Sequence, residues 1–184
     1  GLELENVAVS RLLGKKEKGV LALIDIGGRN TSINIVDKGN LRLSRNIDTA
    51  GGDFTQVLSS GLGVSPMRAE QLKKASGLNL QTGGEVKVLN LLMPLLDVIK
   101  RETEKVIGNY YLRTKRQVEK IILTGGGSNL QGLDEYYSQQ MSLPVIKSDP
   151  FSLGLISYDP SLLPIIKEIG PCLTSACAVV FKDI

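Results

Sequence analysis

Apolar and polar residues alternate along three stretches in the first quarter of the chain, which is the pattern of β-strands with two different faces. The stretches are Val20–Gly27, Thr31–Asp37 and Leu41–Asp48, and the first is the most uniformly apolar. Short connections that contain glycine or asparagine separate them. This spacing predicts a meander of three antiparallel strands.

Helical periodicity marks the segments on either side of these strands. The first dozen residues repeat apolar positions at helical spacing, and so does Phe54–Gly63, with Asp53 near its cap. Ser65 followed by Pro66 is a strong helix start, because serine caps the first turn and proline fits the first helical position.

A longer helix is predicted near the middle of the chain. Its apolar stripe advances in steps of three, four and seven residues through Val88, Leu92, Leu95, Ile99, Val106 and Tyr110. Pro94 lies inside this stretch, where proline favours a kink or a split. The preceding segment, residues 78–85, is predicted as a loop or a short hairpin.

The last third of the chain returns to alternating strand and helix. The predicted elements are, in order, a strand (Val118–Thr124), a turn (Gly125–Gly127), a helix capped by Ser128 and ending near Gln140, a short strand within 143–150 and a final helix within 172–181. Together with the meander, this order predicts an α/β fold with a mixed sheet, its parallel strands added to the meander, and helices on both faces.

Composition is typical of a soluble globular domain and restricts the possible chemistry. The 184 residues are 42% apolar and 22% charged, and a formal net charge of +3 gives no reason to expect nucleic acid. The absence of histidine excludes Ser–His–Asp triads, Cys–His pairs and most zinc sites. We find no apolar run of the about 20 residues that span a bilayer and expect no direct membrane insertion.

The two cysteines, Cys172 and Cys177, lie in one apolar segment. Two are too few for a disulfide scaffold, and a reducing compartment fits this usage. We interpret both as small buried residues on or near a helix.

The first hairpin places an acid and two glycines at its tip. Glycine lets backbone amides approach an anion closely, and successive amides form an anion-binding nest. Asp25 would repel a bare phosphate, but a hydrated Mg²⁺ between them would remove that repulsion, and Thr31 could add a hydroxyl. The alternative is a structural role, in which the aspartate binds the amides of the turn.

The triple-glycine turn is the second candidate. A strand, Gly125–Gly127 and a capped helix would expose bare backbone where a phosphate or the flat face of a base can bind. It is not a Walker loop, because no Gly-Lys-Ser/Thr follows, and Leu130 replaces the last glycine of GxGxxG. A tight strand-to-helix turn is the alternative. Glu70 and Lys73 lie three residues apart on one predicted helix. The alternative to a functional role for them is an ordinary surface ion pair.

The order of these motifs resembles a known superfamily. "DIGGRNTSINI", "GGDFTQVLSSGLG", "AEQLK" and "ILTGGGSNLQGL" follow one another as in the nucleotide-binding half of actin-like ATPases, which have a ribonuclease H-like fold. The chain looks most like the PilM family of type IV pilus assembly proteins and next like the FtsA cell-division family. "LENVAVSRLL", "MPLLDVIKRETEKVIGNYY" and "LPVIKSDPF" extend the PilM resemblance over almost the whole chain.

The resemblance implies roles for particular residues. Asp25, Gly27, Gly28 and Thr31 match the second phosphate loop, with Asp25 on the Mg²⁺ side through water. Glu70 and Lys73 match the helix that reaches the ribose and base, whereas Gly125, Gly126, Gly127 and Ser128, with Leu130 after them, match the adenosine loop. Arg29 and Asn30 belong to the implied site but stand where FtsA-like loops prefer glycine and threonine, so Arg29 either reaches a phosphate or blocks it.

The resemblance also implies a domain organisation. Residues 1–18 correspond to a crossing helix and connector, and 19–184 to the nucleotide-binding lobe, with a small helical subdomain at about 64–90. The first lobe of the family, with its phosphate loop, is absent from the sequence. No residue here is a good candidate for a catalytic base, and we expect the chain alone to bind ATP at millimolar concentration or not detectably.

Three functions remain open at this point. The first is an ATP- or ADP-binding lobe of a PilM-like cytoplasmic scaffold, with possible self-association. Pilus proteins would hold this scaffold near the inner membrane. One of them is a PilN-like tail, which would dock mainly on the absent lobe. The second is an FtsA-like or sugar- or acid-kinase-related enzyme, at most a slow ATPase here. The third is a decayed nucleotide site that serves only protein interaction.

Overall fold

A computed structural model describes residues 3–15, 17–78, 83–154 and 156–181. Its single five-stranded sheet has the order β3–β2–β1–β4–β5. The strands are β1 (Val20–Ile26), β2 (Thr31–Asp37), β3 (Asn40–Ile47), β4 (Val118–Thr124) and β5 (Val145–Lys147). Strands β1, β2 and β3 pair antiparallel, whereas β4 pairs parallel with β1 and with β5. The predicted meander and mixed sheet are confirmed.

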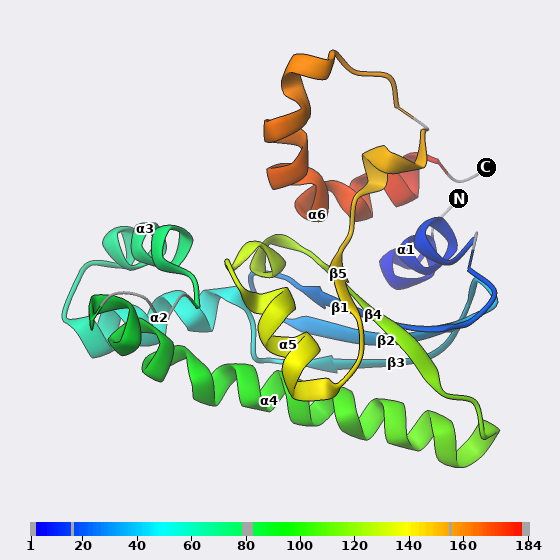
Figure 1. Ribbon diagram of the computed structural model, residues 1–184, viewed down its shortest axis with the longest axis horizontal. Helices are drawn as coiled ribbons and strands as arrows, with labels where there is room; N and C mark the ends of the chain where they lie inside the picture. Colours follow the sequence, from blue (N-terminus) through cyan, green and yellow to red (C-terminus); the bar gives the residue numbers. More distant parts are fainter. Residues whose placement is uncertain (1–2, 16, 79–82, 155, 182–184) are drawn as a thin grey trace.

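Helices cover both faces of the sheet, as predicted. The six helices within the described residues are α1 (Glu5–Gly14), α2 (Gly51–Leu62), α3 (Pro66–Ser76), α4 (Gly83–Thr114), α5 (Leu133–Met141) and α6 (Leu163–Val180). Short 3₁₀ helices span Gly126–Asn129, Pro150–Leu153 and Pro160–Leu162. Figure 1 shows α1 and α6 on one side of the sheet and the long α4 on the other, with α2 and α3 beyond one end.

The core is divided into two clusters because neighbouring strand residues point to opposite faces. On β1, Ile24 and Ile26 join the larger cluster with helices α2, α4 and α5, whereas Leu21 and Leu23 join the cluster with α1 and α6. Burial on both faces explains why β1 is apolar along most of its length. Asp25 is the exception in this strand, and it lies on the α1–α6 face.

The predicted long helix is confirmed as α4, which runs through Pro94 without a break, so of the predicted kink or split the split is wrong. Proline removes only one hydrogen bond of the helix, and its ring here lies on the exposed side. Leu92 and Leu96 on either side of it are fully buried and hold both halves against the core. Leu96 rather than Leu95 completes the buried stripe. Of the predicted loop at 78–85, residues 79–82 lie outside the described residues.

The triple-glycine turn leads to a different structure from the one predicted. Ser128 lies within a 3₁₀ helix, and its hydroxyl donates to the Gly125 carbonyl at 2.7 Å, so it does not cap α5. Helix α5 begins only at Leu133, after Gly132, whose φ of +77° favours glycine. Helix α2 begins three residues before the predicted Phe54, because the Asp53 carboxylate accepts a hydrogen bond from the Ala50 amide at 2.8 Å.

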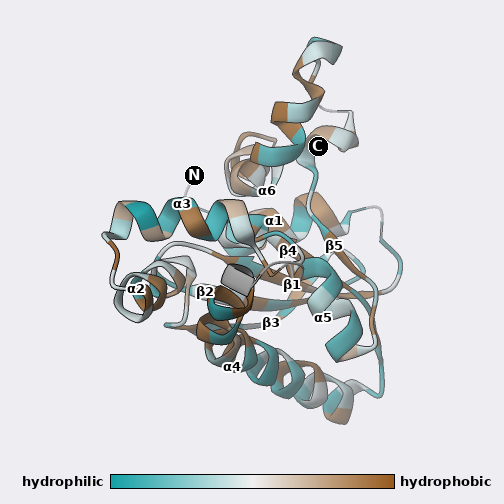
Figure 2. Cartoon of the chain, turned by 60° about the vertical axis from the view of Figure 1, so that its left-hand side comes forward, coloured by the Kyte–Doolittle hydropathy of each residue, from teal (hydrophilic) through white to brown (hydrophobic). Residues whose placement is uncertain are grey.

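Helix α6 is longer than the predicted final helix and bends in its middle, where Pro171 interrupts its hydrogen bonds (Figure 1). Figure 2 shows its first half standing away from the body of the protein. Residues Pro160–Val180 are long and apolar enough to cross a membrane by length and composition, which corrects our statement that no such run exists. Core helices of soluble proteins also meet that criterion, and a third of this segment is buried against the rest of the fold.

A buried polar cluster fixes the end of α4 to the sheet. The Tyr110 hydroxyl donates to the Asp37 carboxylate at 2.6 Å, and Arg116 forms an ion pair with the same carboxylate at 2.7 Å. Asp37 and Tyr110 are both buried. Burial and the neighbouring Asp37 carboxylate raise the pKa of Tyr110, so the hydroxyl remains a proton donor at neutral pH.

This cluster predicts different effects for two adjacent tyrosines. Tyr110→Phe removes a hydrogen bond to a buried charge and should lower the free energy of unfolding by about 1.5–3 kcal/mol. Tyr111→Phe is the matched control, because Tyr111 is 41% exposed, and its effect should stay within about 0.5 kcal/mol. Urea denaturation measures both, and equal effects would contradict a stabilising role for the Tyr110–Asp37 bond.

Candidate functional site

The tip of the β1–β2 hairpin carries the N-terminus of α2. The Gly51 amide donates to the Gly27 carbonyl at 2.9 Å, and the Gly52 amide donates to the Gly28 carbonyl at 3.0 Å. A Cβ atom on Gly52 would lie 2.6 Å from that Gly28 oxygen. Glycine in α2 therefore permits contact between two backbones, and the hairpin tip is held in one position.

The triple-glycine turn packs against the same hairpin. Gly125 has a φ of +80°, and its amide donates to the Pro171 carbonyl of α6 at 3.0 Å. A Cβ atom on Gly125 would collide with the Asp25 carboxylate, and one on Gly127 with the Ile26 side chain. Gly126 differs, because its nearest neighbour would be the Cys172 sulfur at 3.8 Å. Gly125 and Gly127 therefore allow close contact with β1, whereas the backbone at Gly126 has open space in front of it.

Helix α3 contributes an organised ion pair. Lys73 Nζ lies 2.7 Å from the Glu70 carboxylate and donates to the Gly51 carbonyl at 3.0 Å. The Thr55 hydroxyl donates to Glu70 at 2.6 Å. Burial opposes ionisation of Glu70, but hydrogen bonds from Lys73 and Thr55 outweigh it, so the pKa of Glu70 lies below its ordinary value. The pair links α3 to the start of α2, which an isolated surface pair would not do.

Asp25 is in a different environment, on the α1–α6 face of the sheet. Desolvation by burial, followed by the charge of Glu5, raises the pKa of Asp25 from its ordinary 3.8 to about 6, and a hydrogen bond with Ser175 opposes the shift. The Asp25 carboxylate lies beside the Gly125 backbone, and the charge of Glu5 acts on it. Such an arrangement disfavours a bare negative charge and favours a bound cation.

These elements surround one cleft of about 600 Å³. It lies between the hairpin tip, the start of α2, α3, the triple-glycine turn and the middle of α6. Of the predicted site residues, those that line it are Gly27, Gly28, Glu70, Lys73, Gly126, Gly127 and Leu130. The volume is within the range of about 300–1,000 Å³ that is usual for small-molecule and cofactor sites.

Comparison with known proteins identifies the family of the chain. A family model described as "Type IV pilus assembly protein PilM" matches residues 3–177. The chain belongs to the PilM family. Over 180 residues this PilM-family chain is 27% identical to the cell division protein FtsA of Pseudomonas aeruginosa, with 83% of the chain and 43% of FtsA covered.

Two solved structures have the same fold. The match to a structure of the PilM-PilN type IV pilus biogenesis complex has a TM-score of 0.83 at 21% identity and covers 99% of this chain and 52% of that one. The match to MreB 5 of Spiroplasma citri bound to AMPPNP has a TM-score of 0.68 at 16% identity and covers 96% and 57%. The fold is therefore actin-like, and the PilM-family chain spans about half the length of these proteins.

The remaining predicted site residues do not line the cleft. These are Asp25, Arg29, Asn30, Thr31, Gly125 and Ser128. Thr31 is fully buried, and its hydroxyl donates to the Thr49 carbonyl at 2.7 Å, so this PilM-family chain uses it to fix the segment before α2. Arg29 lies exposed near the hairpin tip.

Several lining residues were not predicted as site residues. They are Gly51, Gly52, Thr55, Lys74, Asn129, Gln131, Glu168, Ile169 and Cys172. The glycine pair after the third strand was a signal for the first two, because adjacent glycines at a helix start indicate a close backbone contact. Cys172 was predicted to be buried, but only Cys177 is, and Cys172 is exposed at the cleft.

The two kinds of glycine predict two stability effects. Gly127→Ala forces a methyl group into Ile26 and should lower the free energy of unfolding by about 1–3 kcal/mol. Gly28→Ala is the control, since a Cβ atom there meets nothing within 4 Å, and its effect should stay within about 0.5 kcal/mol. Urea denaturation measures both changes, and a harmless Gly127→Ala would show that the turn does not pack as described.

The raised pKa of Asp25 predicts a pH-dependent effect on stability. Because the folded pKa of about 6 exceeds the ordinary 3.8, ionisation destabilises the folded chain as pH rises through this interval. Asp25→Asn should therefore raise the free energy of unfolding by about 1–2 kcal/mol at pH 7, and the gain should vanish near pH 4. Denaturant titrations without divalent cations measure it. The exposed Asp48→Asn is the control, and an equal gain there would contradict the cause given.

Proposed function

We propose that the chain is the ATP-binding lobe of a PilM-like scaffold protein for type IV pilus assembly. The observation that supports this proposal is the single cleft on which the hairpin tip, the triple-glycine turn and the Glu70–Lys73 pair converge. Gly28 offers backbone without a side chain for the phosphates, and Gly126 does so for the adenosine. In this proposal Glu70 and Lys73 on α3 contact the ribose and base.

The proposal includes a magnesium ion, although Asp25, its implied ligand, does not line the cleft. Asp25 would hold it through water, because Mg²⁺ usually retains several waters and binds proteins through one or two carboxylates. Burial and, after it, the charge of Glu5 raise the pKa of Asp25, and a nearby cation would oppose this shift. Among the described residues, no group of three or more His, Cys, Asp or Glu side chains could hold a metal by itself. When bound, the ion neutralises phosphate charge.

A scaffold role is favoured over fast catalysis, because the chain belongs to a family of pilus assembly proteins. Of the two carboxylates that line the cleft, Glu70 is paired with Lys73, and Glu168 lies on α6. In this proposal nucleotide stabilises one shape of the protein, and turnover is slow at most. An FtsA-like ATPase is the second candidate, supported by the similarity to FtsA.

The partners follow from the same proposal. One structural neighbour is a PilM-PilN complex. We infer that the protein recruits a PilN-like tail through regions mainly outside this chain. It would then act in the cytoplasm, next to the inner membrane, where such tails are held. Self-association is compatible with this role.

Blocking the open face of the triple-glycine turn tests nucleotide binding. Gly126→Val adds a side chain where the fold leaves space, so the free energy of unfolding should change little while ATP affinity falls at least about tenfold. We expect a millimolar dissociation constant for the unsubstituted chain, so the titration is best carried out on the longest natural form of the protein. Calorimetry with Mg²⁺ and ATP measures it.

Gly108→Val is the control, because a Cβ atom at Gly108 meets nothing within 4 Å and the residue lies on α4, away from the cleft. ATP affinity should be unchanged in this variant. Equal affinity in both variants, in a protein that binds ATP, would place the nucleotide elsewhere. Failure of any form to bind ATP would favour a decayed site that serves only protein interaction.

A further inference from the structure

The end of the protein away from the candidate nucleotide site is rich in basic residues. Three connections meet there: the one from α1 to β1, the turn between β2 and β3, and the one from α4 to β4. Strand register brings them together, because Val20 at the start of β1 pairs with Asp37 on β2 and with Val118 on β4. Figure 1 shows α4 ending on this side, whereas α2 and α3, which border the cleft, lie on the opposite side.

Basic side chains outnumber acidic ones in these connections. We define the basic end as residues 15, 17–20, 37–40 and 113–120. It contains seven basic and three acidic residues, so its excess of four positive charges is larger than the net charge of +3 of the whole chain. The positive charge of the protein is therefore concentrated at one end. The basic residues are Lys15, Lys18, Lys38, Arg113, Lys115, Arg116 and Lys120.

Most of these cations have no acidic partner. Arg116 pairs with the buried Asp37 at 2.7 Å, and Lys120 pairs with Glu17 at 2.8 Å. The third acid of the basic end is the exposed Glu119. Five cations are exposed and form no ion pair with any residue that the structure describes, namely Lys15, Lys18, Lys38, Arg113 and Lys115. Their charges are therefore available to a partner.

Two of these five lysines occupy backbone positions that do not favour lysine. Lys38 has a φ of +52° and Lys115 a φ of +59°. This left-handed region is unfavourable for a residue with a long side chain and is tolerated best by glycine, asparagine and aspartate. Lys38 and Gly39 form the turn between β2 and β3, where asparagine before glycine is the usual pair. The fold does not require lysine at either position, so what lysine adds there is its charge.

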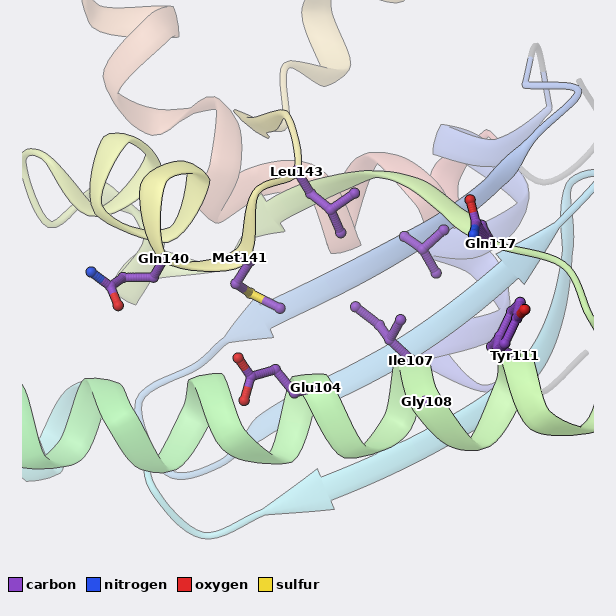
Figure 3. A pocket seen from close by; sticks show the side chains of 9 residues that line it. Glu104, Ile107, Gly108, Tyr111, Gln117, Gln140, Met141 and Leu143 are labelled. Atoms are coloured by element: carbon purple, nitrogen blue, oxygen red, sulfur yellow. The ribbon is translucent and has the colours of Figure 1, made fainter.

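Exposed apolar side chains accompany the cations where α4 ends. Leu112 is 67% exposed and Tyr111 is 41% exposed. Figure 3 shows Tyr111 near the end of α4, at the margin of a cavity of about 450 Å³. The ammonium group of Lys115 lies 5.6 Å from the centre of the Tyr111 ring. Tyrosine beside lysine, with an exposed leucine, is a combination that is common where proteins meet the surface of a membrane.

We propose that the basic end binds the surface of a bilayer that contains anionic phospholipids. The unpaired cations come from three separate connections and are all exposed, so they form a broad charged surface that suits many headgroups better than it suits one peptide. Each lysine or arginine near such a surface strengthens binding about fivefold, so five of them give binding at roughly millimolar lipid. The contact requires no membrane-crossing segment and is independent of nucleotide binding.

Flotation of the 184-residue chain with lipid vesicles tests the proposal. One set of vesicles is pure phosphatidylcholine, and the other replaces part of it with phosphatidylglycerol, which is anionic. The chain should float with the anionic vesicles in low salt and not with the neutral ones. High salt should weaken this binding at least about tenfold, because it screens exposed charges. No binding to the anionic vesicles, or equal binding to both sets, would overturn the proposal.

Variants of the protein test whether the basic end is the contact surface. Lys38→Asn combined with Lys115→Asn should weaken binding to anionic vesicles at least about tenfold. Thermal stability should be preserved, because asparagine tolerates a positive φ. Lys87→Gln combined with Lys167→Gln is the control, since both lysines are exposed, lie on α4 and α6 outside the basic end and carry the same charge. Equal weakening in the two double variants would show that only net charge matters and would overturn the assignment.

A competitor distinguishes a bilayer from an acidic protein segment. Polyglutamate is added to the chain bound on anionic vesicles, with as many carboxylates as there are anionic headgroups. Most of the chain should stay on the vesicles, because the broad surface is matched by many headgroups at once. Complete displacement would overturn the choice of a bilayer and would identify an acidic polypeptide as the partner.

Discussion

The site depends on direct contact between backbones at glycine. The hairpin tip, the start of α2 and the triple-glycine turn approach so closely that Gly52, Gly125 and Gly127 have no room for a Cβ atom. Two hydrogen bonds from α2 amides to hairpin carbonyls hold the arrangement. Since a side chain at any of these positions would separate the segments, the cleft exists only because the chain places glycine at three separate points.

Local patterns predicted the parts of the fold that depend on near neighbours in the sequence. Alternation located β1, β2 and β3 to within one residue, and Ser65 with Pro66 located the start of α3. The long helix α4 was predicted, but the alternative of a split at Pro94 was wrong, because burial of Leu92 and Leu96 by distant elements outweighs the local effect of the proline. The start of α5 was missed as well, since Ser128 binds the Gly125 carbonyl and the positive φ of Gly132 cannot be read from composition.

The candidate site also has a part that local motifs predicted and a part that they did not. Gly28, Gly126, Glu70 and Lys73 belong to recognisable local motifs, and the structure places them on one cleft. The wall contributed by α6 follows no local signal. Its position depends on the Pro171 carbonyl, which accepts hydrogen bonds from the Gly125 amide and the Thr124 hydroxyl, more than 40 residues earlier. Such a contact is decided by tertiary packing, and a single sequence does not reveal it.

Asp25 shows where the fold tolerates an unfavourable interaction. A carboxylate at the end of a buried strand, close to Glu5, is harder to ionise than in water, and a neutral residue there would avoid that cost. Nothing in the packing of β1 requires an acid, because asparagine has nearly the same shape. The acid therefore makes physical sense if a cation shares the site when the protein functions, since the same negative charge that destabilises the free chain then binds the ion.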